Sequence, residues 1–263
     1  MRLLLETSKD FLKKCIINQI IFMSNLFDIK NKIFIIVGAS SGIGKKLSEV
    51  LPKYGAKVYG FARRKLKTDN FVYSQNGPEN PKKFEEEIKK IYFKEKKISA
   101  LVNCAAITHQ DNLKNSIKKF DYIINTNLKL PFVASIIVSE FMKRDSSIIN
   151  ICSIASYLGF PNNPCYVASK GGLKQLSKAL ALDLSTKKIR VNNVIPGYIK
   201  TPMTIKSYKN KKRNQLIKNK TILNRWGTTD DLVGPIIFLS SASSSYMTGS
   251  DIFVDGGWYA KGV

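Results

Sequence analysis

Tyr166 and Lys170 stand four residues apart in the segment Pro-Cys-Tyr-Val-Ala-Ser-Lys. Positions i and i+4 of a helix project from one face, so the phenol and the ammonium address the same small volume. A free tyrosine has a pKa near ~10, and a fixed cation nearby favours the phenolate and lowers that value. Ser153, at the end of an apolar run, would add a hydroxyl that holds a substrate oxygen beside the phenol. Alone, the pair also fits an ordinary exposed helix, so its meaning depends on its surroundings.

A glycine-rich loop follows the apolar, β-branched run 32–37 and precedes a helical stretch at 45–54. The loop residues proposed to bind a cofactor are Gly38, Ser40, Ser41, Gly42, Ile43 and Gly44. Between a strand and a helix, glycines let the backbone approach a pyrophosphate closely, and the helix N-terminus offers N–H groups and partial positive charge. This context predicts a dinucleotide site, with a plain glycine-rich turn as the alternative.

The second strand, 57–61, ends in Ala62-Arg63-Arg64 without an acid. At this point an Asp or Glu would bind the ribose 2′-hydroxyl of NAD, whereas an Arg accommodates a 2′-phosphate. A guanidinium binds phosphate in a bidentate manner. The sequence therefore predicts NADP(H) in preference to NAD(H), with Arg63 leading and Arg64 assisting. The alternative is that both are loop charges in solvent.

Strands and helices alternate along the chain. Strands are expected at 32–37, 57–61, 70–73, 98–103, 147–152, 189–195 and 251–254, and helices at 45–54, 81–94, 116–143 (kinked at Pro131), 164–184 and 230–240. This order predicts an α/β fold with a single Rossmann-type, doubly wound parallel sheet of about seven strands and helices on both faces. Ligands of such sheets bind beyond the carboxyl ends of the strands. Gly38, Asn103, Ser153 and Pro196 all follow strands, so the motifs converge on one edge.

Composition narrows the function classes. The chain has 263 residues, 44% of them hydrophobic, and no Pro/Ser/Gly-rich linker, so one domain over 23–263 is expected. The net charge is +24, but the lysines are spread out without a nucleic-acid motif, which favours a solvated surface over nucleic-acid binding. No apolar run reaches ~18 residues, so no membrane span is expected.

Cysteine and histidine usage argues against a metal site. The cysteines Cys15, Cys104, Cys152 and Cys165 lack metal-ligand spacing, and His109 is the single histidine. Reduced thiols fit a cytoplasmic protein. Cys152 and Cys165 flank the serine and the tyrosine, where small apolar fillers are expected; redox sensitivity would need an exposed thiolate.

Residues 1–22 precede a second methionine, Met23. Met23 begins a run that leads straight into the first strand, so we expect Met23 to be the natural start and residues 1–22 to be an extension that is not native or is disordered. The segment lacks a small-residue cleavage site of the signal-peptide type. An organellar transit peptide is the second reading, disfavoured by Glu6 and Asp10.

Further motifs make the chain resemble the short-chain dehydrogenase/reductase superfamily from about Phe27 to Gly257. The resemblance rests on the glycine loop, Asn103-Cys-Ala105-Ala, Asn127 in Asn-Thr-Asn-Leu, Ser153 with Tyr-x-x-x-Lys, Pro196-Gly197 followed by Ile199 and Thr201, Arg225-Trp-Gly, and Thr248-Gly-Ser-Asp-Ile-Phe-Val-Asp-Gly-Gly257. The departures are Val37 in place of a threonine, Cys104 and Ala106 in the Asn-Asn-Ala-Gly motif, and the absence of an acid around Ser74-Gln75.

The resemblance implies an NAD(P)-dependent enzyme that moves a hydride between nicotinamide and a carbonyl or secondary alcohol. It implies four catalytic residues: Tyr166 as general acid or base, Lys170 lowering its pKa, Ser153 orienting the carbonyl, and Asn127 holding a water that extends a proton relay. It implies cofactor contacts from Asn103, Ala105, Tyr166, Lys170, Pro196, Gly197, Ile199 and Thr201 besides the loop and the arginines. It also implies a homotetramer formed through the helices 116–143 and 164–184.

The substrate remains open. The chain resembles 3-oxoacyl-acyl-carrier-protein reductases and also gluconate and other sugar-acid or polyol dehydrogenases; a non-catalytic NADP-binding regulator is an alternative of another class. Residues 198–225 are expected to form a substrate lid, and its cations are Lys206, Lys209, Lys211, Lys212, Arg213, Lys218 and Lys220. They suit either a solvated helix or a funnel for an anionic or carrier-bound substrate. His109 suits the pocket or an ordinary loop equally well.

Overall fold

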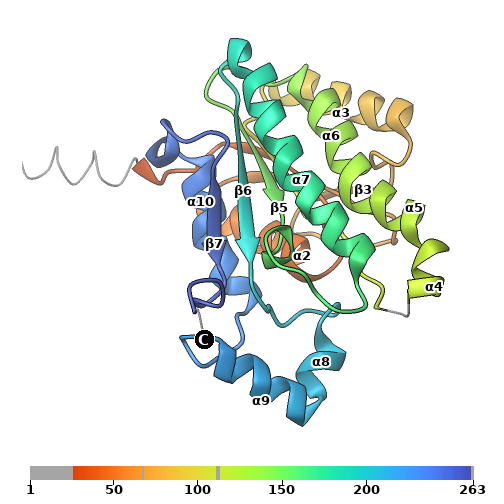
Figure 1. Cartoon of the computed structure of the whole chain (residues 1–263). Helices are drawn as coiled ribbons and strands as arrows, with labels where there is room; N and C mark the ends of the chain where they lie inside the picture. Colours follow the sequence, from red (N-terminus) through yellow and green to blue (C-terminus); the bar gives the residue numbers. More distant parts are fainter. Residues whose placement is uncertain (1–25, 67, 111–112, 262–263) are drawn as a thin grey trace, which may run out of the picture.

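Seven parallel strands form the centre of the molecule in the order β3-β2-β1-β4-β5-β6-β7 (Figure 1). The computed structural model describes residues 26–66, 68–110 and 113–261. The strands are β1 (Ile33–Val37), β2 (Lys57–Phe61), β3 (Val72–Ser74), β4 (Ala100–Asn103), β5 (Ser147–Ile151), β6 (Arg190–Pro196) and β7 (Asp251–Val254). The order reverses between β1 and β4, which defines a Rossmann-type, doubly wound sheet and confirms the predicted fold class. The proposed start at Met23 lies outside the described residues.

β1 shows why the central strands are almost entirely apolar. All five of its residues are buried. Ile33, Ile35 and Val37 pack into the core on one face of the sheet, and Phe34 and Ile36 pack into the core on the other. Successive strand side chains point to opposite faces, so a strand covered on both sides needs apolar residues at every position.

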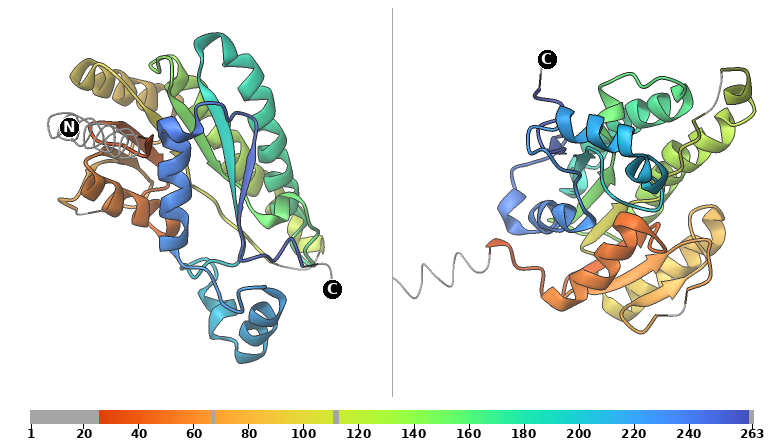
Figure 2. Two further views of the ribbon diagram at one scale, coloured as in Figure 1. Left: turned by 90° about the vertical axis from the view of Figure 1, so that its left-hand side faces the viewer. Right: turned by 90° about the horizontal axis from the view of Figure 1, so that it is seen from below.

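Helices cover both faces of the sheet (Figures 1 and 2). One face is covered by α3 (Pro81–Glu95), α6 (Leu130–Ser139) and α7 (Pro164–Asp183), which contribute Phe84, Val138 and Leu180 to its core. The other is covered by α2 (Gly42–Val50) and α10 (Val233–Ser240), which contribute Leu47 and Ile236. Short 3-10 helices occupy Leu51–Tyr54 (η1), Ile154–Ser156 (η3), Ser185–Lys187 (η4), Thr229–Leu232 (η5) and Ala242–Ser244 (η6).

Two predicted helices differ from the structure. α2 begins at Gly42 rather than at residue 45, so the end of the glycine loop forms the first helical turn. The expected helix 116–143 is divided into α4 (Leu113–Ile117), α5 (Phe120–Ile124), a π-helical turn (η2, Asn125–Lys129) and α6. Pro131 lacks an N–H for the usual i to i−4 bond, and the chain widens just before it instead of bending at it.

The lid lies beyond the carboxyl edge of the sheet. It contains α8 (Ile205–Lys209) and α9 (Lys211–Lys220), which follow the end of β6 and project away from the sheet in two views (Figures 1 and 2). An isolated bridge between Ile199 and Gly227 closes the base of this excursion. The two ends of the lid segment are therefore held together by this bridge.

One described helical run, Phe120–Ser139, is long and apolar enough to cross a membrane by length and composition, with a mean hydropathy of 1.2. Of that window, 44% is buried inside the protein. Ala134 and Val138 pack into the core on one face of the sheet. One face of the run thus packs into the core, while Phe132 and Ile136 on the run are exposed.

Candidate active site

A cavity of about 440 Å³ opens at the carboxyl edge of the sheet, a size typical of ligand pockets. It extends from the arginines after β2, past the glycine loop, to the tyrosine and lysine of α7. The predicted site residues that line it are Gly38, Ser40, Ser41, Gly42, Ile43, Arg63, Arg64, Ala105, Ser153, Tyr166, Lys170, Pro196, Gly197, Ile199 and Thr201. Three predicted site residues do not line the cavity: Gly44, Asn103 and Asn127. Their positions are described below with the elements that carry them.

The glycine loop is shaped by close backbone contacts. Gly38 has a φ of +93°, and a Cβ there would lie 2.6 Å from the Ala105 nitrogen. Gly44 lies behind the loop, where a Cβ would lie 2.4 Å from the Gly38 carbonyl oxygen. A side chain at either position would therefore push the loop away from the helix or from the β4 edge. At Gly42, by contrast, a Cβ would meet only Thr201, at 3.6 Å.

The N-terminus of α2 points into this cavity without a side-chain cap. Its N-cap residue, Ser41, has extended backbone, and its side chain makes no capping hydrogen bond. No acidic residue occupies the first turn. The first N–H groups of the helix are thus available to an anion, and the helix dipole favours one. Together with the elongated cavity, this arrangement fits the pyrophosphate of a dinucleotide.

Tyr166 and Ser153 meet at the inner end of the cavity. Tyr166 lies in the first turn of α7, and Ser153 is the N-cap of η3, where its Oγ accepts a hydrogen bond from the Ala155 N–H at 3.1 Å. Burial raises the pKa of Tyr166 to about 12, and a hydrogen bond with the Ser153 hydroxyl opposes the increase. Burial of the phenol is the dominant influence on its pKa in this geometry, and the lowering by Lys170 stays a prediction.

Lys170 is the only charged side chain among the largest fully buried ones of the described residues, at 2% exposure. Its Nζ donates a hydrogen bond of 2.7 Å to the Ile151 carbonyl oxygen and lies 5.9 Å from the centre of the Tyr166 ring. Burial lowers the Lys170 pKa. Acceptors on a bound ligand, added to the Ile151 carbonyl, would stabilise its charged form.

Asn127 is fully buried in the π-helical turn. Its Oδ1 accepts from the Ile107 N–H at 2.8 Å, and its Nδ2 donates to the Ile107 carbonyl at 2.8 Å and to Ser169 Oγ at 3.0 Å. The side chain therefore joins the loop after β4 to η2 and α7. A water of the predicted relay could be held by the second lone pair of Oδ1 or by the backbone carbonyl, whose i+4 residue, Pro131, has no N–H to donate.

Asn103 ends β4 within a row of buried polar residues rather than in the cavity. Asn103, Asn150, Asn193 and Asp251 are register partners on four neighbouring strands. Asn103 Nδ2 donates to Asn150 Oδ1 at 2.8 Å, and Asn193 Nδ2 donates to Asp251 Oδ1 at 2.7 Å. Ser177 of α7 bridges the two pairs, accepting from Asn150 and donating to Asn193. Asn103 thus joins neighbouring strand ends and does not line the cavity, and its cofactor contact stays a prediction.

The arginines after β2 lie at the outer end of the cavity, together with an acid that the sequence analysis missed. Arg64 Nη2 donates to Ser41 Oγ at 3.3 Å, and Arg63 Nη1 donates to the Tyr122 hydroxyl at 3.0 Å. Glu79 also lines the cavity, and its Oε1 lies 3.9 Å from Arg63 Nε. An acid was expected directly after β2 or around Ser74-Gln75 after β3, whereas Glu79 comes later, after the Asn-Gly-Pro run that precedes α3.

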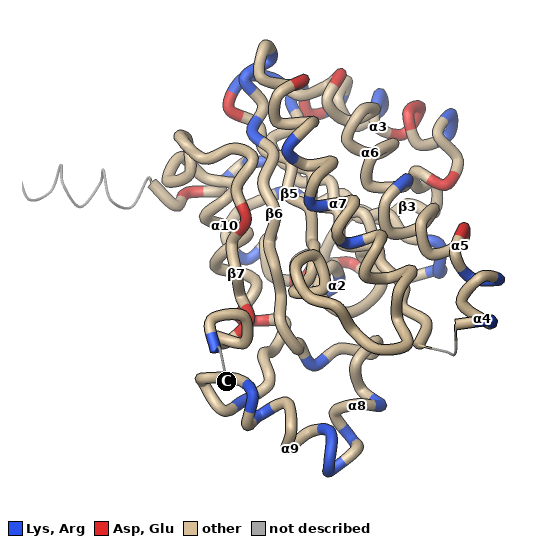
Figure 3. The backbone as a smooth tube through the Cα atoms, in the orientation of Figure 1, with Lys and Arg blue, Asp and Glu red and all other residues tan. Residues whose placement is uncertain are grey.

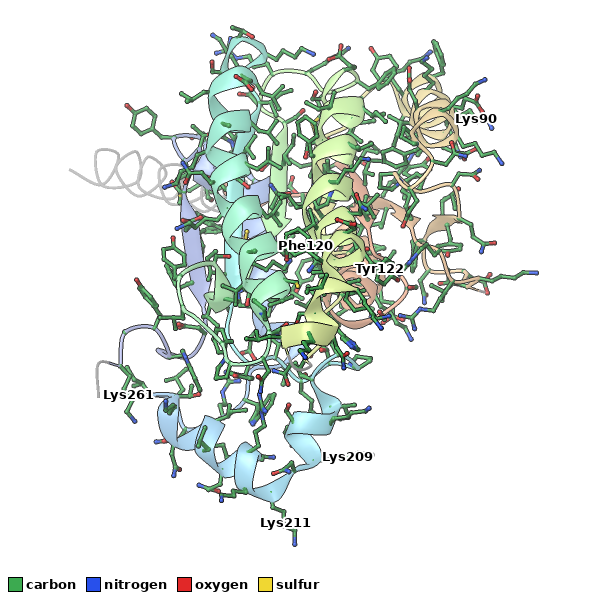
Figure 4. All side chains as sticks on the ribbon, turned by 45° about the vertical axis from the view of Figure 1, so that its right-hand side comes forward. Lys90, Phe120, Tyr122, Lys209, Lys211 and Lys261 are labelled. Atoms are coloured by element: carbon green, nitrogen blue, oxygen red, sulfur yellow. The ribbon has the colours of Figure 1, made fainter. Side chains whose placement is uncertain are left out.

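The lid contributes few groups to the cavity. Pro202, Met203 and Thr204 line it, but none of the lid cations named above does, and neither does His109. The lid is basic and without acids over its whole length (Figure 3). Lys211 projects away from the body of the domain (Figure 4). This placement favours the solvated reading of the lysines over the funnel.

Burial keeps the thiols of the site protonated, which makes them poor nucleophiles. Cys104 and Cys152 both line the cavity, and burial raises the pKa of each thiol to about 12. Cys165 is buried as well. These properties match small apolar fillers. No group of three or more His, Cys, Asp and Glu side chains within 26–66, 68–110 and 113–261 has a metal-binding arrangement.

Comparison with known proteins defines the family. The family model described as Enoyl-(Acyl carrier protein) reductase matches residues 38–259. The 3-oxoacyl-acyl-carrier-protein reductase FabG of Rickettsia prowazekii is 36% identical over 244 residues, covering 88% of this chain and 98% of the relative. The 2-dehydro-3-deoxy-D-gluconate 5-dehydrogenase of Bacillus subtilis is 29% identical over 256 residues, covering 91% and 99%.

A solved structure extends this likeness to the fold. The gluconate 5-dehydrogenase of Burkholderia cenocepacia, in complex with NADP and tartrate, has a TM-score of 0.84 at 26% identity and covers 90% of this chain and 98% of its own. The matched family model includes every residue that lines the cavity except Val37. The chain belongs to the short-chain dehydrogenase/reductase family and is an oxidoreductase of carbonyl and CH–OH groups.

Proposed function

We propose that the chain is an NADPH-dependent carbonyl reductase whose leading substrate class is a 3-oxoacyl thioester. One observation carries the proposal: a single cavity joins Ser153, Tyr166 and Lys170 at one end to Arg63 and Arg64 at the other. Such a cavity suits a nicotinamide dinucleotide with its reactive ring near the tyrosine and its adenosine phosphate near the arginines. The 36% identity to a 3-oxoacyl-acyl-carrier-protein reductase supports the substrate class.

The bound cofactor supplies the hydride, and the side chains of the chain handle the proton and the orientation. Tyr166 hydrogen-bonds the substrate oxygen and donates its phenolic proton in the reductive direction. Its raised pKa keeps the phenol protonated at neutral pH, which suits a general acid. Ser153, already hydrogen-bonded to Tyr166, orients the same oxygen and stabilises the charge that develops on it.

Lys170 holds the cofactor ribose and replaces the proton lost from Tyr166. Burial lowers its pKa, which makes the ammonium a better proton donor than an exposed lysine. Asn127 contributes its backbone carbonyl oxygen as an acceptor, since Pro131 four residues on has no N–H, while its side chain bonds to Ile107 and Ser169. A water at that carbonyl would connect Lys170 to solvent.

Arg63 and Arg64 support a preference for NADP(H) over NAD(H). Both line the cavity, and a guanidinium is suited to a 2′-phosphate. The solved gluconate 5-dehydrogenase of similar fold carries NADP. The test is kinetic: Arg63→Ala should raise the Michaelis constant for NADPH about tenfold and leave that for NADH nearly unchanged. Equal effects on both cofactors would remove the basis for the preference.

A second candidate function is oxidation or reduction of a sugar acid such as gluconate. Its support is the likeness to a 2-dehydro-3-deoxy-D-gluconate 5-dehydrogenase and to the gluconate 5-dehydrogenase structure. The deciding experiment follows NADPH absorbance with acetoacetyl thioesters and keto-sugar acids at equal concentrations. Faster oxidation with the thioester supports the leading proposal, and faster oxidation with keto-sugar acids supports the second. A flat trace with both groups and a broad ketone panel favours a non-catalytic NADP-binding regulator.

The remaining properties follow from the same proposal. Residues 198–225 act as the substrate lid, with Met203 and Thr204 facing the cavity. A homotetramer is supported by exposed apolar side chains such as Ile117 on α4 and Leu182 on α7. Phe120 on α5 is exposed as well (Figure 4). The free thiols of Cys104, Cys152 and Cys165 fit a cytoplasmic location. Sedimentation of the purified chain would test the oligomer.

A further inference from the structure

The outer end of the cavity holds a carboxylate within a group of cations. Glu79 Oε1 lies 3.9 Å from Arg63 Nε, and both residues line the cavity with Arg64. The pair is partly open to solvent, with side-chain exposures of 55% for Arg63 and 36% for Glu79. An exposed pair of this kind adds little to stability. Its position beside the proposed adenosine end is therefore the feature that needs an explanation.

The Glu79 side chain is placed by the turn that carries it. A Cβ on Gly77 would lie 2.5 Å from Glu79 Oε2, so the carboxylate folds back over a residue that has no side chain. The Asn80 N–H bonds to the Gly77 carbonyl at 3.1 Å, which closes the turn. Gln75 Nε2 donates to the Arg63 carbonyl at 2.8 Å and joins this turn to the arginine loop. The two loops thus hold the Glu79 carboxylate beside the Arg63 guanidinium.

Arg63 is engaged on a second side as well. Its Nη1 donates to the hydroxyl of Tyr122 on α5, and its guanidinium carbon lies 6.0 Å from the centre of that ring. A 2′-phosphate that recruits Arg63 must therefore compete with Glu79 and tolerate a negative charge next to it. The same carboxylate can accept a hydrogen bond from a free ribose 2′-hydroxyl, as acids do in NAD sites.

We propose that Glu79 is a specificity-determining residue for the cofactor: it opposes the 2′-phosphate of NADP(H) and favours the free ribose of NAD(H). The chain then uses both cofactors, and the preference given by Arg63 and Arg64 is smaller than those two arginines alone would produce. This inference rests on the proposed binding of a nicotinamide dinucleotide in the cavity. It does not depend on which carbonyl compound is reduced.

The experiment measures binding, so it does not require turnover. Dissociation constants of 2′,5′-ADP and 5′-ADP are measured calorimetrically with the full chain, for wild type and Glu79→Gln. Removing the charge should tighten binding of 2′,5′-ADP and weaken that of 5′-ADP. The preference ratio, which is the dissociation constant of 5′-ADP divided by that of 2′,5′-ADP, should rise about fivefold. The change should shrink at about 0.5 M salt because screening weakens the charge on Glu79.

Two further variants separate a local effect from a general one. Glu85→Gln is the matched control, because Glu85 pairs with Lys89 on α3 at 2.6 Å and does not line the cavity; its ratio should equal that of wild type. In Arg63→Ala, the effect of Glu79→Gln should fall to less than half, since the two side chains act as a pair.

The outcomes are distinguishable from those of the proposed function. A Glu79→Gln ratio within the error of wild type, or a change equal to that of Glu85→Gln, would overturn the role of Glu79. If both fragments bind and the ratio moves as expected while no carbonyl compound is reduced, the proposed reaction fails and the role of Glu79 stands. The thermal midpoint of each variant confirms that the fold is retained.

Discussion

The Lys170 ammonium donates a hydrogen bond of 2.7 Å to the carbonyl of Ile151, the last residue of β5. Ser153 follows two residues later, so this bond ties the face of α7 that carries Tyr166 to the strand end that carries the serine. The acid–base pair is thereby held against the sheet and not only by its own helix. Replacing Lys170 separates its catalytic and structural roles.

Lys170→Met should lower kcat at least about 100-fold, because the cation that supports proton transfer is lost. Its free energy of unfolding should change little, since removal of a buried charge offsets the loss of one hydrogen bond to Ile151. The measurements are steady-state kinetics and urea unfolding. A large loss of stability with retained kcat would assign Lys170 a structural role alone.

Tyr166→Phe should abolish turnover, by a factor of about 1000 or more, and keep NADPH binding within about twofold, because only the proton donor is removed. Tyr92→Phe on α3 is the matched control: its ring packs on Phe141, away from the cavity, and activity should be retained. Cofactor binding is followed by fluorescence and turnover by absorbance. Near-wild-type turnover in Tyr166→Phe would refute the scheme.

The pH dependence should differ between the two directions. Reduction needs the protonated phenol, and burial raises the Tyr166 pKa to about 12, so kcat/KM for reduction should not fall through titration of Tyr166 across neutral pH. Alcohol oxidation needs the phenolate, so its kcat/KM should increase with pH from neutrality upward. Rate profiles in both directions check this; an oxidation rate that falls with increasing pH from 7 to 9 would contradict it.

Gly44→Ala should weaken cofactor binding at least about tenfold, because a Cβ would lie 2.4 Å from the Gly38 carbonyl oxygen and displace the glycine loop. Gly234→Ala in α10 is the matched control, since a Cβ there meets nothing within 4 Å. That change should preserve binding and stabilise the fold by about 0.5–1 kcal/mol. Titration with NADPH and thermal unfolding measure both effects.

Asp231 should contribute to stability above about pH 4. Hydrogen bonds from Arg225 at 2.7 and 2.9 Å, and a capping box with Thr228, hold its pKa below the usual range. A carboxyl with a lowered folded-state pKa stabilises above its unfolded pKa near 3.9, and the effect is lost as pH falls through the folded value. Asp231→Asn should cost about 1 kcal/mol at pH 7 and progressively less below pH 4.

The neighbouring acid supplies the control for this prediction. Asp230 pairs with Lys46 at 2.7 Å, but its side chain is 68% exposed. Asp230→Asn should therefore change the free energy of unfolding by less than about 0.5 kcal/mol at either pH. Urea unfolding at pH 7 and pH 3 tests both variants. Equal costs for the two substitutions would show that the capping box adds nothing.

Periodicity predicted the sheet well because its strands are covered on both faces, and β1 is apolar at every position for that reason. It failed over 116–143, where the pattern of one long helix continued across the break. Hydropathy periodicity registers which face is buried, and it is insensitive to a single π-helical turn before Pro131.

The sequence by itself determined the chemistry-bearing types and their local spacing: the Tyr166/Lys170 pair on one helical face and the glycine loop between a strand and a helix. Both features depend only on residues that are close together along the chain, so the amino-acid order is enough to define them. Only the tertiary structure decided that the Asn127 side chain bonds to Ile107, that burial raises the Tyr166 pKa, and that Glu79 faces Arg63. Such properties depend on groups brought together from distant segments, and burial and charge act through space rather than along the chain.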